Sequence, residues 1–201
     1  AALAMCLYGF ALVQTRVIMA SLLLGGGWAL LSVSAGFLLP AALMVMAAGL
    51  LASAQWRFKR YYIVLVGALA VALPLMLVYP FALYHTDAAA FQLWVQRHLF
   101  GAYGGTHTFQ TAFSAGYYLK NLLWFAFPAW ALAIWTATRV KLVQSRWGVL
   151  ALAWIGVVAL LLSFSPERFQ DILLWVPPPP ALFAAALLDG LPICAAAFIN
   201  W

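Results

Sequence analysis

Acidic residues are nearly absent from this sequence. Ten of its 201 residues are Lys or Arg, but only four are acidic: Asp87, Glu167, Asp171 and Asp189. Proton transfer by carboxylates therefore has few candidate residues. Cysteine is also scarce. Cys6 and Cys194 lie near opposite ends of the chain within apolar sequence, so we expect buried, unreactive thiols rather than a disulfide framework or a metal site.

Charged residues of either sign are rare, and apolar sequence takes their place. The chain is 68% hydrophobic and 7% charged, and its apolar runs recur along nearly the whole length. The runs are continuous and rich in Leu, Ala and Val, whereas the strands of a membrane barrel alternate over about ten residues. The sequence therefore predicts an all-α integral membrane protein, a polytopic bundle of about six to seven transmembrane helices.

The apolar runs differ in length and in how they are interrupted. Residues 1–13 are too few for a full span of about twenty residues. The glycines at 25–27 would permit close helix packing, and a hairpin is predicted to reverse near Gly36 and Pro40. Four successive prolines at 177–180 exclude regular helix there. The other runs are predicted to cross the bilayer: 17–35, 37–54, 61–84, 117–138, 147–164 and the interrupted 172–192.

The two ends of the sequence lack the usual signals of a complete membrane protein. The chain begins without Met, has no basic leader with a cleavage site, and stops at Trp201 just as another apolar run starts. We therefore expect residues 1–201 to form a single transmembrane domain that is a fragment of a longer protein.

The net charge of +6 comes largely from two short clusters. Such clusters are typical of cytoplasmic turns, because Lys and Arg are retained on that side of the membrane. We therefore predict a multi-pass protein of the bacterial inner membrane with segments 55–60 and 139–146 in the cytoplasm, and no nucleic-acid partner. The clusters contain six of the ten cations: Arg57, Lys59, Arg60, Arg139, Lys141 and Arg146.

A long polar and glycine-containing segment at 85–116 separates two apolar runs. By alternation of crossings it lies opposite the basic clusters, so it is predicted to be a periplasmic loop. Its many large apolar groups are unusual for a solvated coil. We expect an ordered cap with juxtamembrane helices on the membrane surface. The apolar groups are aromatic: Phe91, Trp94, Phe100, Tyr103 and Phe109.

This loop also contains titratable groups. Asp87 is a candidate catalytic carboxylate, and the competing interpretation is that it caps a helix. His85, His98 and His107 have no compact ligand spacing, so the sequence requires no metal cofactor, and a divalent metal is possible but unsupported.

Cations on the loop side need an explanation, since that side disfavours them. Arg97, His98, Lys120 and Arg168 could bind a lipid phosphate through charge-assisted hydrogen bonds. Tyr117 and Tyr118 precede Lys120 and belong to the same candidate set. The alternative is that these long side chains simply reach the interface from apolar helices.

Three segments resemble a known family: FQLWVQRHLFGAYGG, AFSAGYYLKNLLWFAFPAWALAIW and SPERFQDILLWVPPPPALFAAALLDGL. The chain resembles bacterial C-type membrane glycosyltransferases of glycosyltransferase family 39, the protein O-mannosyltransferase and aminoarabinose transferase type, over residues 17–201. In that family a periplasmic loop precedes a YYL-containing helix, and a proline-rich stretch follows a basic residue. Arg168 matches this basic residue, and residues 175–182 match the proline-rich stretch.

The resemblance implies transfer of a sugar from a polyprenyl-phosphate carrier to a lipid or protein acceptor at the periplasmic face, as in lipopolysaccharide modification. Membrane lipids are then further partners. The family's catalytic carboxylate lies in a first periplasmic loop that has no counterpart here. The chain would then lack its catalytic base and contain residues for the carrier phosphate: Arg97, His98, Tyr117, Tyr118, Lys120 and Arg168.

Two other functions remain open from the sequence. A secondary transporter also has helices broken by Pro and Gly, but no matching pair of interrupted segments and no buried carboxylate suited to ion coupling is found here. A non-catalytic scaffold of an envelope-polymer assembly system would explain the missing catalytic carboxylate if the chain were the whole protein.

Overall fold

A computed structural model describes residues 1–111 and 145–164 of the chain. All regular structure in these ranges is helical, which confirms the predicted all-α class for this part. The predicted crossings 117–138 and 172–192 lie outside the described residues. The helices and two short 3-10 turns (η) are: α1 Ala2–Leu12, α2 Val17–Ala35, α3 Leu38–Gly49, η1 Leu50–Ala52, α4 Lys59–Thr86, α5 Ala88–Arg97, η2 Gly101–Tyr103 and α8 Arg146–Ser163.

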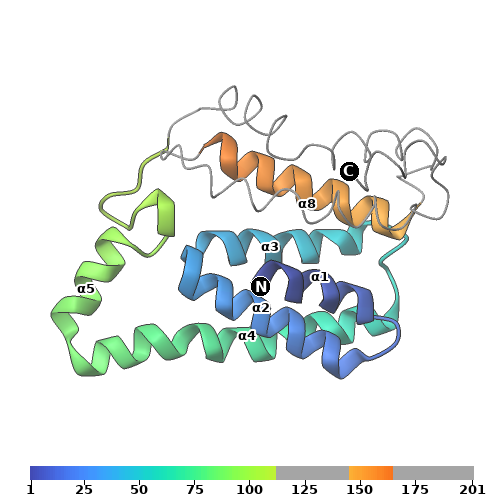
Figure 1. The fold of residues 1–201 in the computed structure, drawn as a ribbon, viewed down its shortest axis with the longest axis horizontal. Coiled ribbons are helices and arrows are strands. Elements are labelled where there is room, and N and C mark those ends of the chain that lie inside the picture. The colour runs from blue at the N-terminus through green and yellow to red at the C-terminus, as the bar shows by residue number, and fades with distance from the viewer. Residues whose placement is uncertain (112–144, 165–201) are drawn as a thin grey trace, which may run out of the picture.

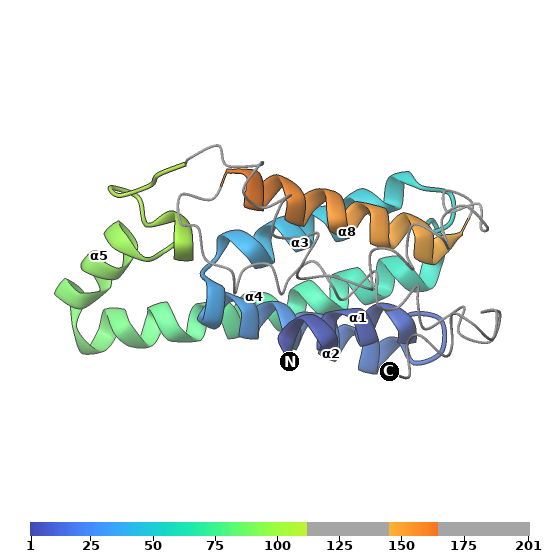
Figure 2. The same cartoon turned by 45° about the horizontal axis from the view of Figure 1, so that its top comes forward.

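The longer helices run alongside one another, and α5 stands apart at one end (Figure 1). Helix α2 has its most extensive contacts with α4 and α1, and α3 contacts α2 and α8. The turned view shows α8 lying along α3, away from α4 (Figure 2). Successive helices α1 to α4 alternate in direction, as expected for a bundle with short connections.

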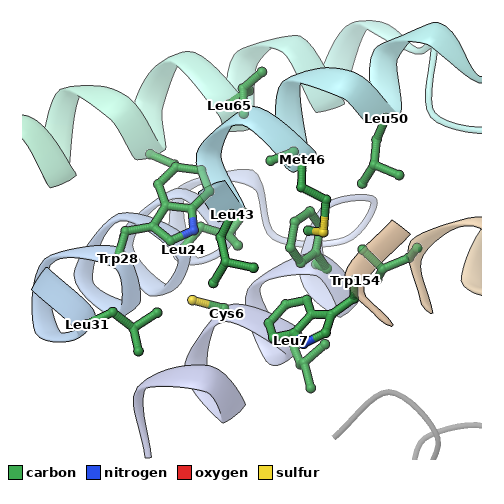
Figure 3. Close-up of a cluster of buried hydrophobic side chains, with 14 of the residues drawn as sticks. Cys6, Leu7, Leu24, Trp28, Leu31, Leu43, Met46, Leu50, Leu65 and Trp154 are labelled. Carbon is green, nitrogen blue, oxygen red and sulfur yellow. The ribbon is translucent and has the colours of Figure 1, made fainter. Parts of the chain in front are cut away.

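The core lies where α1, α2, α3, α4 and α8 meet (Figure 3). Trp28, Trp154 and Cys6 are fully buried there, so the predicted burial of the Cys6 thiol is confirmed. Ser21 links α2 to α4, since its hydroxyl donates to the Val64 carbonyl over 3.3 Å and to the Val17 carbonyl over 3.0 Å. Such a bond satisfies a polar group inside an apolar bundle.

The outer surface of the bundle is apolar. Ile18 and Val45 are 77% and 73% exposed, and α4 alone exposes ten large apolar or aromatic side chains. Leaving such groups in water would cost about 25 cal/mol per Å². By length and composition, α2, α4 and α8 can each cross a membrane.

Small residues let α2 approach its neighbours, as the sequence predicts. A Cβ atom added to Gly25 would lie 2.6 Å from the Ala68 carbonyl oxygen of α4, and one added to Gly27 would lie 2.6 Å from the sulfur of Cys6 in α1. Gly26, between them, has open space to 3.7 Å. Two of the three glycines are therefore required for close helix contact.

The predicted reversal between α2 and α3 is confirmed at Gly36, whose φ is 77°. Pro40 is not part of this turn. It lies in the first turn of α3. Backbone N–H groups in a first turn have no acceptor within the helix, so the proline there removes no helical hydrogen bond.

Helix α4 corrects the predicted start of the loop at residue 85. It continues to Thr86 and contains Pro74 and Pro80 in its interior. Its 28 residues correspond to about 42 Å, longer than a hydrocarbon core of about 30 Å. The local sequence remains helix-compatible through residue 86, although its polarity rises.

The alternating helices create two distinct ends. We call the one that holds Arg16, Arg57, Lys59, Arg60 and Arg146 the basic end. It is defined by two long-range hydrogen bonds: the Trp56 indole donates to the Arg146 carbonyl over 3.1 Å, and the Arg60 guanidinium donates to the Gln14 carbonyl. Segment 55–60 and residue 146 therefore lie together.

Two adjacent glycines test the packing of α2 against α4. Gly25→Ala should destabilise the bundle by about 1 to 3 kcal/mol, because backbone must move to admit the methyl group. Gly26→Ala is the matched control and should be neutral or stabilising, since Ala favours helix by up to about 1 kcal/mol. Thermal unfolding in detergent measures both, and equal melting temperatures for the two variants would contradict the assigned contact.

Candidate functional site

The candidate site begins at the single residue that joins α4 to α5. Asp87 has φ −153° and ψ 98°, and its Oδ1 atom accepts hydrogen bonds from the backbone N–H groups of Ala89 at 2.9 Å and Ala90 at 3.0 Å. Its own N–H donates to the Leu83 carbonyl over 2.9 Å. Of the two roles considered for Asp87, helix capping is the one the structure displays.

Aromatic side chains fix the corner between α4 and α5. Tyr84 meets Phe91 with ring centroids 5.4 Å apart, and Tyr79 meets Trp94 at 5.6 Å. Trp94 also meets Phe37, in the α2–α3 turn, at 5.9 Å. These three pairs have interplanar angles of 72° to 80°, the edge-to-face geometry that aromatic rings favour. These ring contacts therefore join α4 to α5 and also attach α5 to the α2–α3 turn.

The chain after α5 folds back onto that helix. Thr106 donates its N–H to the Val95 carbonyl over 3.0 Å, and His107 donates to the Gln96 carbonyl over 3.2 Å. The Thr108 hydroxyl donates to the same Gln96 oxygen over 3.1 Å. These bonds satisfy carbonyls that the last turn of a helix leaves open.

A second set of contacts attaches this segment to the bundle. Phe37 donates its N–H to the Leu99 carbonyl over 3.0 Å, and Gly36 lies against the backbone of Gly101, whose φ is 64°. The buried Tyr103 donates its hydroxyl to the Leu161 carbonyl of α8. We call residues 87–111 the cap. The cap contains the short helix α5, as expected for this part of the predicted segment 85–116.

Arg97 and His98 lie at the C-terminal end of α5, and both are exposed. A cation is stabilised there by the helix dipole. Asp87 caps the other end of α5, about 15 Å away along the axis, and is the only acidic residue among those the structure describes. Within the same residues no carboxylate forms an ion pair with Arg97.

The remaining predicted phosphate ligands lie outside the described residues: Tyr117, Tyr118, Lys120 and Arg168. Their relation to Arg97 stays a prediction. No group of three His, Cys, Asp or Glu side chains that could hold a metal occurs in the described ranges. His85 instead meets Phe81, with ring centroids 4.4 Å apart.

The residues that attach the cap could not be identified from the sequence. Tyr103 stands out there only as an aromatic group of the loop, although its hydroxyl donates to a carbonyl 58 positions away. The signal in the sequence is glycine: Gly101 begins the 3-10 turn, Gly104 follows it, and both have positive φ. Their spacing indicates a tight local structure but not its partner.

The Tyr103 contact predicts the stability of the cap. Tyr103→Phe keeps the ring but removes the donor to α8, which should lower the free energy of local opening by about 1 kcal/mol and speed amide exchange over residues 99–109 about fivefold. Hydrogen exchange with mass spectrometry measures this. Tyr84→Phe, at a side chain that is 56% exposed, is the control; equal exchange in the two variants would argue against the contact.

Comparison with known proteins adds no relative from which function could be transferred. Neither protein-family models, nor curated proteins, nor solved structures give a match to this chain.

Proposed function

We propose that this chain is the carrier-binding part of a membrane glycosyltransferase. The enzyme would move a sugar from a polyprenyl-phosphate carrier to a lipid or protein acceptor at the periplasmic face of the bacterial inner membrane. The observation that carries the proposal is an exposed guanidinium, Arg97, next to His98 on an ordered cap attached to apolar helices. The residues of the cap from 91 to 105 are also the first segment that resembles the family.

The geometry of the cap suits recognition of a lipid phosphate. Aromatic groups at the α4–α5 corner, Tyr79 and Tyr84 among them, are 46% and 56% exposed and favour the boundary between hydrocarbon and headgroups. Arg97 is the last residue of α5, about three helical turns beyond the corner. An isoprenoid chain in the bilayer would thus present its phosphate near the level of this cation.

The proposed reaction is an inverting displacement. An acceptor oxygen attacks the anomeric carbon, the bond from that carbon to the phosphate oxygen breaks, and the bonding electrons leave with the phosphate. The acceptor proton passes to a carboxylate, which on the family pattern belongs to a loop upstream of this chain. Arg97, with Lys120 and Arg168 as further candidates, would stabilise the charge that develops on the phosphate.

The proposed topology follows from the two ends. The basic end faces the cytoplasm by the positive-inside rule, and the cap faces the periplasm. The three described helices that can cross a membrane, the shorter apolar helix at Leu38–Ala52 and the predicted crossings 117–138 and 172–192 make six spans of the proposed bundle. The short helix α1 would be a seventh.

Transfer of radiolabelled sugar from polyprenyl phosphate tests the function directly. Membranes containing the full-length gene product should transfer the label, while membranes containing residues 1–201 alone should not, because on the family pattern the base would belong to an upstream loop. Activity in neither preparation, with both proteins present by immunoblot, would favour transport or scaffolding instead.

Arg97 can be tested in the full-length enzyme. Arg97→Gln should lower turnover about 100- to 1,000-fold, the usual effect of losing one donor to a developing oxyanion. Arg16→Gln removes an exposed cation at the basic end and should leave turnover unchanged. Equal turnover by Arg97→Gln and the wild type would exclude Arg97 from carrier binding.

A further inference from the structure

The basic end contains a cationic and aromatic face that the proposed transfer reaction does not use. Trp56, in the connection between η1 and α4, is fully buried. Its ring centroid lies 5.7 Å from Phe10 of α1, 5.0 Å from Tyr61 of α4 and 6.3 Å from Trp147 of α8. Together with its indole hydrogen bond to the Arg146 carbonyl, these contacts make Trp56 the centre of this end.

Two guanidinium groups are fixed around that centre. Arg146 places its Cζ atom 5.0 Å from the Trp147 ring centroid and 5.8 Å from that of Trp56, which are cation–π distances. Arg57 donates from Nε to the Leu51 carbonyl over 3.3 Å and from a terminal nitrogen to the Ala52 carbonyl over 3.1 Å. Because a guanidinium has five N–H donors, both side chains retain donors for a further acceptor.

The charge of this face is not neutralised within the described residues. Arg57 and Lys59 are exposed, and Arg146 is half-buried. The one acidic residue in the described ranges, Asp87, lies beyond the far end of α4. Within the described residues the face therefore places cations beside the half-buried ring of Trp147, with no carboxylate next to them.

Apolar surface continues from this face along the bundle. Tyr62 and Ile63 of α4 are 45% and 50% exposed, and Leu152 of α8 is 49% exposed. A ligand with an anionic head and hydrocarbon chains matches both parts, because phosphate oxygens accept from guanidinium groups while acyl chains cover apolar side chains.

We propose that Arg57, Lys59, Arg146 and Trp147, supported by Trp56, bind the headgroup of an anionic phospholipid in the leaflet at the basic end. The charge of the face selects phosphatidylglycerol over a zwitterionic lipid, and the fixed guanidiniums make the interaction local rather than a general attraction to the surface. This lipid is separate from the carrier proposed for the cap, at the opposite end of α4.

Native mass spectrometry of the full chain with equimolar phosphatidylglycerol and phosphatidylcholine measures the preference. The wild type should retain mainly phosphatidylglycerol. Arg57→Gln and Arg146→Gln should each reduce the preference about fivefold, whereas Arg16→Gln, which removes an exposed cation of the same end outside this set, should not change it. Equal retention of the two lipids by the wild type, or an unchanged preference in both glutamine variants, would overturn the proposal.

Two further measurements use the wild-type protein and need no substitution. High salt screens an electrostatic site, so the wild-type preference should fall in 1 M ammonium acetate relative to 0.1 M; a preference independent of salt would contradict the site. Free glycerol phosphate at the concentration of the lipid should not compete, and displacement by it would identify a soluble anion instead. Melting temperatures of the glutamine variants in phosphatidylcholine alone verify that they remain folded.

Discussion

The structure depends on one constraint: the backbone N–H and carbonyl groups at the ends of its helices need hydrogen-bond partners. Each helix leaves four N–H groups and four carbonyls without intrahelical partners, and in a chain this apolar the hydrocarbon around it cannot supply them. At the cap, Asp87 accepts from the first N–H groups of α5, and the backbone of Thr106 and His107 donates to its last carbonyls. At the basic end, Arg57 donates to the last carbonyls of η1, and Arg60 donates to the Gln14 carbonyl, which follows α1.

The same polar contacts also set the tertiary arrangement. Arg60 and Trp56 each donate to a carbonyl in another part of the chain. The same hydrogen bonds that satisfy these carbonyls therefore also hold neighbouring helices together. At the cap, Tyr103 does the same with α8. Between the two ends the contact is nearly all van der Waals, and glycines of α2 determine how near α1 and α4 approach. Polar bonds at the ends and close packing between them are complementary parts of one bundle.

The sequence predicts those features that local chemistry determines. Long apolar runs indicate helices, Gly36 indicates the reversal, and a residue such as Asp87 before an apolar segment can cap it. Features set by distant residues could not be read in this way. The corner between α4 and α5 is held by ring contacts such as that of Tyr84 with Phe91, and the cap is attached through Phe37 and Leu161, far away in sequence. For the candidate site, the position of Arg97 on the cap was predictable, whereas its separation from Asp87 by the whole of α5 required the structure.

The one-residue junction at Asp87 has a mechanical consequence. Since α4 is longer than a typical hydrocarbon core, it can match the bilayer only by tilting or by extending beyond it. Helix α5 is joined to it without a flexible linker and is held by Tyr84 and Trp94. For a carrier phosphate bound as proposed, the depth of Arg97 would therefore be coupled to bilayer thickness, so that the membrane would set the height at which this cation meets the carrier.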